Sequence, residues 1–136
     1  LQKAKEAGIY PLDYRYESCP VDWTVQEGDV VSVGNYSLKV IETPGHSGDH
    51  ISFLTESKHK TYLFAGDVIF YGGRIQVQYI YDCNVLDYGD SIYKLENLKI
   101  DCLFAGHDTI VLNDGQQHIQ MAIETLKTLG MPKSLF

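Results

Sequence analysis

The sequence predicts a mixed α/β domain of the α+β class, formed as a single unit by residues 1–136. Short β-rich runs lie between turn residues, and two later stretches carry apolar residues at helical spacing. A chain of 136 residues can bury roughly two thirds of its unfolded surface in one core. One domain is therefore expected, without a repeat or a linker.

Residues 1–24 are expected to form the end of a helix and an irregular connection. Gly8 follows a run of helix-favouring residues, as glycine commonly does after the last turn of a helix. The segment 9–24 holds two prolines and scattered aromatic residues without a clear period. The chain starts at Leu1 rather than at a methionine, so we expect it to begin inside a larger protein.

Residues 25–136 are expected to form a sheet with two helices. Residues 30–33 and 37–42 flank Gly34-Asn35, which predicts a hairpin. Residues 51–55 and 61–65 are β-rich and predict a second hairpin, connected by the polar residues 56–60.

The segment after the second hairpin has two interpretations. Residues 75–79 alternate like a strand, or form a long loop lying across a pocket. Asp90 is predicted to cap a helix in which Ile92, Leu95 and Leu98 share one face.

The last predicted elements are a strand and a helix. Residues 102–105 form an apolar run that predicts the strand. Asp114 and Gln117 resemble a capping box, and the helical period after them continues down to Gly130.

Composition excludes several classes of partner. A formal charge of −7 would repel a nucleic-acid backbone, and no apolar stretch approaches the ~20 residues that span a bilayer. The three cysteines are widely spaced, which argues against a disulfide scaffold or a thiolate zinc cage. We expect a cytoplasmic protein that binds a small-molecule substrate, with no nucleic acid and no membrane.

Three apolar runs end on small residues that are followed by a possible metal ligand. His46 follows Thr43-Pro44-Gly45, and the tripeptide Phe-Ala-Gly precedes both Asp67 and His107. Each motif alone is typical of a turn or loop. Zinc ligands must lie about 2.0–2.2 Å from the metal, so donors on separate strands converge only where backbones approach closely. Glycine permits that approach, and the three motifs together predict a metal site.

With these motifs in place, the chain resembles the second half of a metallo-β-lactamase-fold domain, of the metal-dependent hydrolase or glyoxalase II-like kind. The resemblance rests on residues 43–47, 63–67 and 101–107 and covers nearly the whole chain from about Tyr16. It implies a four-layer αβ/βα sandwich, of which this chain is the second half.

The resemblance also implies a dinuclear site, with two zinc ions per complete site and iron or manganese as alternatives. By this resemblance His46 binds the first metal, His107 binds the second, and Asp67 bridges them as the catalytic carboxylate. A metal lowers the pKa of its bound water from 15.7 toward roughly 7, which yields a hydroxide nucleophile. Such a nucleophile attacks an ester, thioester, lactone or amide.

The chain departs from the family because the HxHxDH signature, which supplies four more ligands, is missing from these residues. A catalytic zinc normally has three protein ligands, and here each metal would keep two. We therefore expect this chain alone not to be a competent dinuclear hydrolase. A site left without metal in this chain is an alternative, as is completion by a missing N-terminal half or a homo-oligomer partner.

Further polar residues extend the predicted site. His50, four residues after His46, is predicted to support a ligand or the fold rather than to bind the metal itself. Tyr71 and Arg74 follow the bridging ligand and are candidates for substrate contact. This loop lacks the Gly-Cys-Gly-Arg-Phe-Phe-like stretch of hydroxyacylglutathione hydrolases, which counts against that specific activity.

Two other functions compete with the hydrolase. Two histidines and a carboxylate on one iron form the facial triad of non-haem oxygenases, and the fold hosts a persulfide dioxygenase activity. Alternatively, the chain is a degenerate, non-catalytic module that binds a partner through an exposed apolar face.

Overall fold

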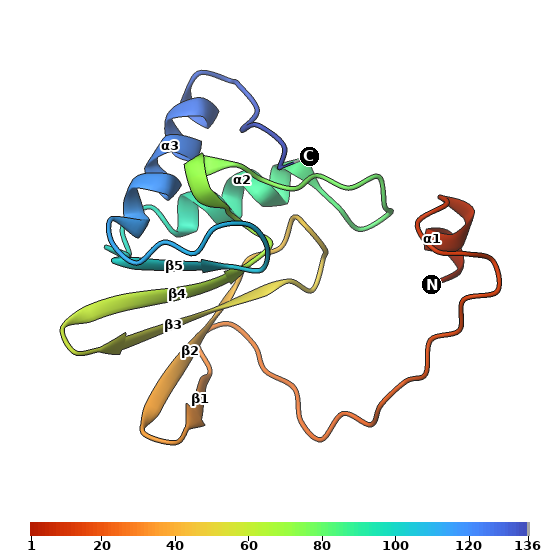
Figure 1. Cartoon of the computed structure of the whole chain (residues 1–136), viewed down its shortest axis with the longest axis horizontal. Coiled ribbons are helices and arrows are strands. Elements are labelled where there is room, and N and C mark those ends of the chain that lie inside the picture. The colour runs from red at the N-terminus through yellow and green to blue at the C-terminus, as the bar shows by residue number, and fades with distance from the viewer. Residues whose placement is uncertain (136) are drawn as a thin grey trace.

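The computed structural model describes residues 1–135, in which a five-stranded sheet carries two helices on one face (Figure 1). The strands are β1 (Val30–Val33), β2 (Tyr36–Glu42), β3 (Ile51–Ser57), β4 (Lys60–Gly66) and β5 (Cys102–Ala105). They lie in chain order across the sheet; β1 to β4 pair antiparallel, and β5 pairs parallel to β4. The helices are α1 (Gln2–Glu6), α2 (Val85–Lys94) and α3 (Gly115–Lys127), with a 3-10 turn η1 (Tyr71–Gly73). The predicted mixed α/β class is confirmed.

Both predicted hairpins are present, and the second is tighter than expected. β3 and β4 are joined by Lys58 and His59 alone, with φ angles of 50° and 64°. Two consecutive left-handed residues match the twist of antiparallel strands, so the ladder extends to the turn itself. The strands therefore include residues 56, 57 and 60, which were expected in the connection. Backbone pairing extends to these polar residues because it does not depend on side-chain polarity.

The prediction that Asp90 caps a helix is wrong, because α2 begins five residues earlier. Asn84 has an extended backbone, and its side-chain oxygen accepts hydrogen bonds from the amides of Leu86 and Asp87 at 2.9 and 3.4 Å. That geometry is the usual one for a helix N-cap. Asp90 lies inside the helix instead.

The capping box predicted for α3 does not form. Asp114 has a left-handed backbone (φ 60°) and makes no side-chain cap hydrogen bond. The amides of Gly115 and Gln116 instead donate to the carbonyl oxygens of Asp101 and Ile100, at 2.9 and 2.7 Å. The start of α3 is thereby held against the chain that enters β5.

Residues 75–79 form a loop rather than a strand. Ile75 alone pairs with the C-terminal segment: its amide donates to the Lys133 carbonyl at 3.0 Å, and its carbonyl accepts from Leu135 at 2.8 Å. The loop runs from η1 to α2 along one edge of the molecule (Figure 1).

The helix end predicted at the N-terminus is confirmed. Gly8 has φ 74°, its amide donates to Lys5, and the Ile9 amide donates to Ala4. These two bonds are those of a Schellman motif. The chain then runs apart from the sheet (Figure 1) and rejoins it just before β1, where the Gly28 amide donates to the Val40 carbonyl at 3.0 Å.

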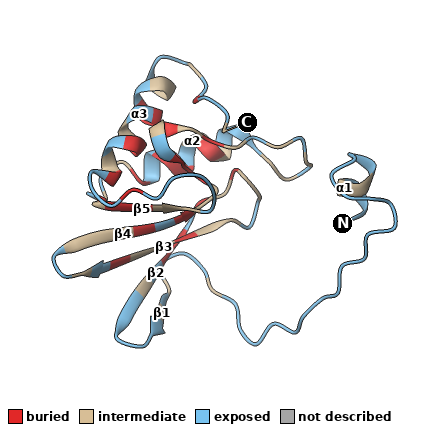
Figure 2. Cartoon of the chain, in the orientation of Figure 1, coloured by how far each residue is buried: buried red, intermediate tan, exposed pale blue. Residues whose placement is uncertain are grey.

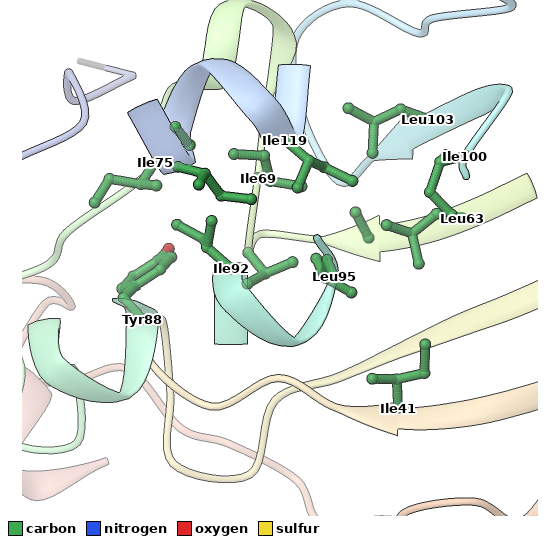
Figure 3. Packing of buried hydrophobic residues seen from close by; sticks show 14 of the residues in the cluster. Ile41, Leu63, Ile69, Ile75, Tyr88, Ile92, Leu95, Ile100, Leu103 and Ile119 are labelled. Atoms are coloured by element: carbon green, nitrogen blue, oxygen red, sulfur yellow. The ribbon is translucent and has the colours of Figure 1, made fainter. Parts of the chain in front are cut away.

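The core lies between the sheet and the two helices, so burial is concentrated on one face of the sheet (Figures 2 and 3). The sheet contributes Ile41, Leu63, Ala65 and Leu103, and the helices contribute Tyr88, Ile92, Ile119, Ala122 and Ile123. The opposite face is open. It carries a groove of about 350 Å³ lined by residues that include Tyr36, Leu38, Tyr62, Phe64 and Phe104, and Phe64 is 41% exposed. We call this the outer sheet groove.

Replacement of Leu63 by alanine should lower the free energy of unfolding by about 2–5 kcal/mol, because it leaves a cavity in a fully buried site. Urea denaturation measures the change. Leu129→Ala is the matched control, since Leu129 is 99% exposed and should change stability by about 0.5 kcal/mol or less. Equal effects of the two substitutions would contradict the placement of the core.

Candidate metal centre

The structure brings His46, Asp67 and His107 together. The Asp67 carboxylate lies between the two imidazoles, with Oδ2 3.5 Å from His46 Nε2 and Oδ1 2.8 Å from His107 Nδ1. These residues follow β2, β4 and β5, which run in the same direction across the sheet. Their carboxyl ends therefore meet at one edge, and the three donors meet there with them.

Glycines allow the strand ends to approach this closely. A Cβ on Gly106 would lie 2.5 Å from Asp67 Oδ1, and one on Gly66 would lie 2.6 Å from His50 Nε2. The Gly106 amide donates to the Gly66 carbonyl at 2.6 Å. In both repeats of Phe-Ala-Gly, a Cβ on the glycine would therefore displace the side chain of His50 or of Asp67.

The ring of His46 is held in one tautomer. Its Nδ1 lies 3.0 Å from the carbonyl oxygen of Gln76, which can only accept, so Nδ1 carries a proton. In the neutral ring the lone pair is then on Nε2, the atom that faces Asp67. A backbone carbonyl in this position is a usual way to orient a metal-binding histidine.

His50 contacts the backbone of Asp67. Its Nε2 accepts the Asp67 amide proton at 2.9 Å, so the neutral ring carries its proton on Nδ1, 2.9 Å from the Thr43 hydroxyl. The chain of hydrogen bonds continues from Thr43 to Ser52 at 2.8 Å, and Ser52 donates to the Ala65 carbonyl at 3.2 Å. Burial, followed by the charge of His46, lowers the pKa of His50. The low pKa favours the neutral ring that these bonds require.

Tyr88 holds the other side of Asp67. Its hydroxyl donates to the Asp67 carbonyl oxygen at 2.6 Å, from a side chain that is 1% exposed. The backbone of Asp67 is therefore bound on both sides, by the half-buried His50 and the buried Tyr88.

Tyr71 and Arg74 are engaged with other residues of this chain. Arg74 forms an ion pair with Asp108, the residue after His107, and its Nε donates to the Tyr71 carbonyl at 3.0 Å. The ring of Tyr71 lies against His118 on α3, with centroids 4.7 Å apart. The ion pair links the loop after Asp67 to the loop after His107.

His118 anchors the η1 turn. Its Nδ1 accepts the Gly72 amide proton at 3.0 Å, and a Cβ on Gly73 would lie 2.8 Å from the Ala122 amide nitrogen. Burial lowers the pKa of His118, while Asp114 opposes the shift. Nothing in the sequence pattern connects this histidine with the loop beyond Asp67.

Sequence reasoning also missed the roles of Tyr88, Gln76 and Ser52, and it named Thr43 only as part of the motif before His46. Tyr88 is indistinguishable from an ordinary core residue by its helical spacing, and Gln76 acts through its backbone carbonyl. Thr43 and Ser52 are fully buried, and their hydroxyls have partners there. The Thr43 hydroxyl contacts His50, and the Ser52 hydroxyl donates to the Ala65 carbonyl. A buried hydroxyl beside a candidate ligand is the signal that would have found them.

These donors fit a metal in kind but are too few for a complete site. Imidazole nitrogen and carboxylate oxygen suit zinc and iron, and each Asp67 oxygen faces a different histidine. Among residues 1–135, no group of three or more His, Cys, Asp or Glu side chains is arranged to hold a metal ion. The three residues bring two imidazoles and one carboxylate to a single edge of the sheet.

One known protein family matches most of the chain. The family described as the metallo-beta-lactamase superfamily matches residues 2–107. The chain belongs to the metallo-β-lactamase superfamily. The resemblance identified from the three motifs is confirmed.

Curated members of the superfamily include similar sequences. The chain is 35% identical over 106 residues to a hydroxyacylglutathione hydrolase of Rhodopseudomonas palustris (strain BisB5), covering 77% of this chain and 40% of that protein. It is 39% identical over 95 residues to a hydroxyacylglutathione hydrolase of Hydrogenovibrio crunogenus, covering 69% and 33%. An atrochrysone carboxyl ACP thioesterase of Aspergillus fumigatus is 29% identical, with 82% and 33% covered. The chain thus spans less than half the length of these relatives.

Solved structures of the superfamily share the fold. The BLEG-1 B3 metallo-beta-lactamase aligns with a TM-score of 0.65 at 23% identity, over 81% of this chain and 53% of that one. ETHE1 from Myxococcus xanthus aligns with a TM-score of 0.55 at 24% identity, over 79% and 52%. Within residues 1–135, none of the helices has the length and apolar character needed to cross a membrane.

Gly45→Ala should destabilise the protein, because a Cβ there would lie 2.6 Å from Tyr88 Cα at a φ of 140°. We expect a loss of roughly 2–6 kcal/mol from overpacking and backbone strain together. Gly48→Ala in the same loop is the control, since its Cβ would approach Asp82 only to 4.0 Å. Urea denaturation of both variants measures the difference, and equal stability would contradict the close approach of α2 to this loop.

The bond from Gly72 to His118 should make stability depend on pH. Because the pKa of His118 is lower folded than unfolded, the unfolded state binds more protons as pH falls below the ordinary value of 6.5. Stability should be full above pH 6.5 and decline as pH falls toward the folded pKa. His118→Gln should flatten this decline in urea midpoints measured from pH 7.5 to 5, although His50 still contributes to it.

His59→Asn is the control for the pH series, because His59 lies in the exposed β3–β4 turn. It should leave the pH profile of the wild type unchanged. A His118→Gln profile as steep as the wild type would show that His118 does not hold the turn in its neutral form.

Proposed function

We propose that this chain supplies part of the metal site of a metal-dependent hydrolase that acts on a carbonyl substrate. The observation that carries the proposal is the Asp67 carboxylate, which presents one oxygen to His46 and the other to His107. His46, Asp67 and His107 would hold the metals, with Asp67 shared between two of them. When bound, such metals lower the pKa of a coordinated water and polarise the substrate carbonyl.

The residues of this chain do the positioning. The Gln76 carbonyl keeps the proton of His46 on Nδ1, so that Nε2 is free to bind. His50 and Tyr88 fix the backbone of Asp67 from its amide and carbonyl sides. Zinc is the metal we propose, since imidazole and carboxylate suit it, and iron or manganese are the alternatives.

A thioester is the substrate class favoured here. Two relatives are named hydroxyacylglutathione hydrolase and one is named an ACP thioesterase. The missing Gly-Cys-Gly-Arg-Phe-Phe-like stretch remains an argument against hydroxyacylglutathione itself. We therefore propose that the substrate is a small acyl thioester, and that its thiol carrier is either glutathione or another thiol.

Completion of the site requires ligands beyond His46, Asp67 and His107. We propose that they come from a further part of the same protein or from a second subunit, and that the outer sheet groove is covered in the complete protein. The aromatic residues that line the groove support this, because a partly exposed cluster of rings is stabilised when another surface packs on it.

An iron-dependent oxygenase is a second candidate. Two imidazoles and one carboxylate are also the ligands of a non-haem iron facial triad, and that observation favours it. The metal content of the purified protein distinguishes the two candidates, because a zinc protein that cleaves thioesters without consuming oxygen fits only the hydrolase.

Asp67→Asn in the full natural protein should abolish thioester hydrolysis. Asparagine keeps one oxygen and replaces the other with an amide nitrogen, so it cannot serve both histidine positions with anionic oxygen. We expect kcat/KM for an acyl-glutathione thioester to fall by roughly 100-fold or more, because even residues that only orient a ligand cost 10–100-fold. Release of free thiol measures the rate, and elemental analysis measures the bound metal. Asp90→Asn on the exposed face of α2 is the charge-matched control. Full activity of Asp67→Asn would refute the proposed function.

A further inference from the structure

Tyr88 belongs both to the core and to the surroundings of the candidate site. It is among the largest fully buried side chains, and it projects from α2 into the space between the helices and the strand ends (Figure 3). Burial raises the pKa of its hydroxyl far above the ordinary value. A tyrosine hydroxyl ordinarily carries its proton at neutral pH, so this group acts as a hydrogen-bond donor.

The hydroxyl contacts two segments that lie outside α2 in the chain. It lies 2.6 Å from the carbonyl oxygen of Asp67 and 3.0 Å from the carbonyl oxygen of Gln76, and it accepts from the Gln76 amide at 3.3 Å. A hydroxyl has one proton, and the shorter distance gives Asp67 the main share of it. Two peptide segments thus converge on a single oxygen atom.

Both segments lead to candidate ligands. Asp67 carries its own carboxylate, and the Gln76 carbonyl also accepts the Nδ1 proton of His46 at 3.0 Å. The Gln76 carbonyl has two lone pairs, so it can accept from His46 and also take the minor share of the Tyr88 proton. The path from Tyr88 to His46 Nε2 therefore runs through one peptide group and one ring.

The rest of α2 holds the loop that carries His46. The Asn84 amide donates to the Gly45 carbonyl at 2.9 Å, and the Ser91 hydroxyl donates to the Pro44 carbonyl at 2.6 Å. Gly45 leaves no room for a Cβ against Tyr88. The loop that carries His46 therefore packs closely against the face of α2 on which Tyr88 lies.

We propose that Tyr88 is a positioning residue, whose hydroxyl sets the Asp67 carboxylate and the His46 ring at a fixed separation before any metal binds. The inference rests on the proposed function, because it takes Asp67 and His46 to be metal ligands that the Tyr88 hydroxyl positions. An ordinary buried tyrosine would stabilise α2 without affecting the ligands. The two possibilities differ in what removal of the hydroxyl changes.

Tyr88→Phe in the full natural protein removes the hydroxyl and keeps the ring. Its zinc affinity, measured by competition with a chromophoric chelator, should fall roughly 10–100-fold, the cost typical of residues that orient ligands. Tyr93→Phe is the matched control on the same helix, since Tyr93 is 40% exposed, and it should retain the wild-type affinity. Unchanged zinc affinity in a folded Tyr88→Phe protein would overturn the inference.

A second readout uses the metal-free protein. Nitrogen NMR of the His46 ring should show a protonated Nδ1 in the wild type and in Tyr93→Phe, and a mixture of tautomers in Tyr88→Phe. A merely structural tyrosine would leave the His46 tautomer unchanged. Wild-type protein that binds no zinc would refute the proposed function, whereas the tautomer of His46 would still decide whether Tyr88 positions it.

The wild type alone supplies a test if Tyr88→Phe does not fold. The hydroxyl proton of Tyr88 should exchange slowly with water, and its resonance should shift when zinc is added, because the bond to Asp67 couples the two groups. A Tyr88 hydroxyl resonance unmoved by bound zinc would overturn the inference.

Discussion

The position of the Asp67 backbone is the constraint on which the candidate site depends. Its amide donates to the neutral ring of His50, and its carbonyl accepts from Tyr88. A carboxylate that must serve two imidazoles at once tolerates little displacement, because each contact depends on a different oxygen. Tyr88 is buried and His50 is half-buried, and their hydrogen bonds are directional, so they fix the Asp67 backbone more firmly than apolar packing alone would.

The architecture explains why these polar groups lie together. Strands β2, β4 and β5 deliver their carboxyl ends to one edge, and the helices cover one face of the sheet. Helix α2 then supplies both core packing, through Ile92, and contact with the site, through Tyr88. The outer sheet groove remains open on the opposite face, where the described chain places no second layer (Figure 2). The same helix, α2, thus contributes both to the core and to the candidate site.

The strands and hairpins can be predicted from the sequence because their apolar periodicity and turn residues are local signals. The same holds for His46, Asp67 and His107 as a group, since each follows a strand and a glycine. The helix starts were misassigned, because Asn84 replaces Asp90 as the cap of α2, and backbone carbonyls replace the side chain of Asp114 at α3. Backbone amides at both helix starts also donate to distant carbonyl groups, from Asn84 to Gly45 and from Gly115 to Asp101, so the starts depend on tertiary contacts. The roles of Tyr88 and the Gln76 carbonyl could not be predicted for the same reason.

The dinuclear interpretation holds that His46 and His107 belong to two different metals joined through Asp67. Cadmium-113 NMR of the full natural protein, correlated with the ring protons of both histidines, distinguishes this arrangement from a single shared metal. Two cadmium resonances are expected, one coupled to His46 and the other to His107. A single cadmium resonance coupled to both histidines, or resonances coupled to neither, would show that Asp67 does not join two metals.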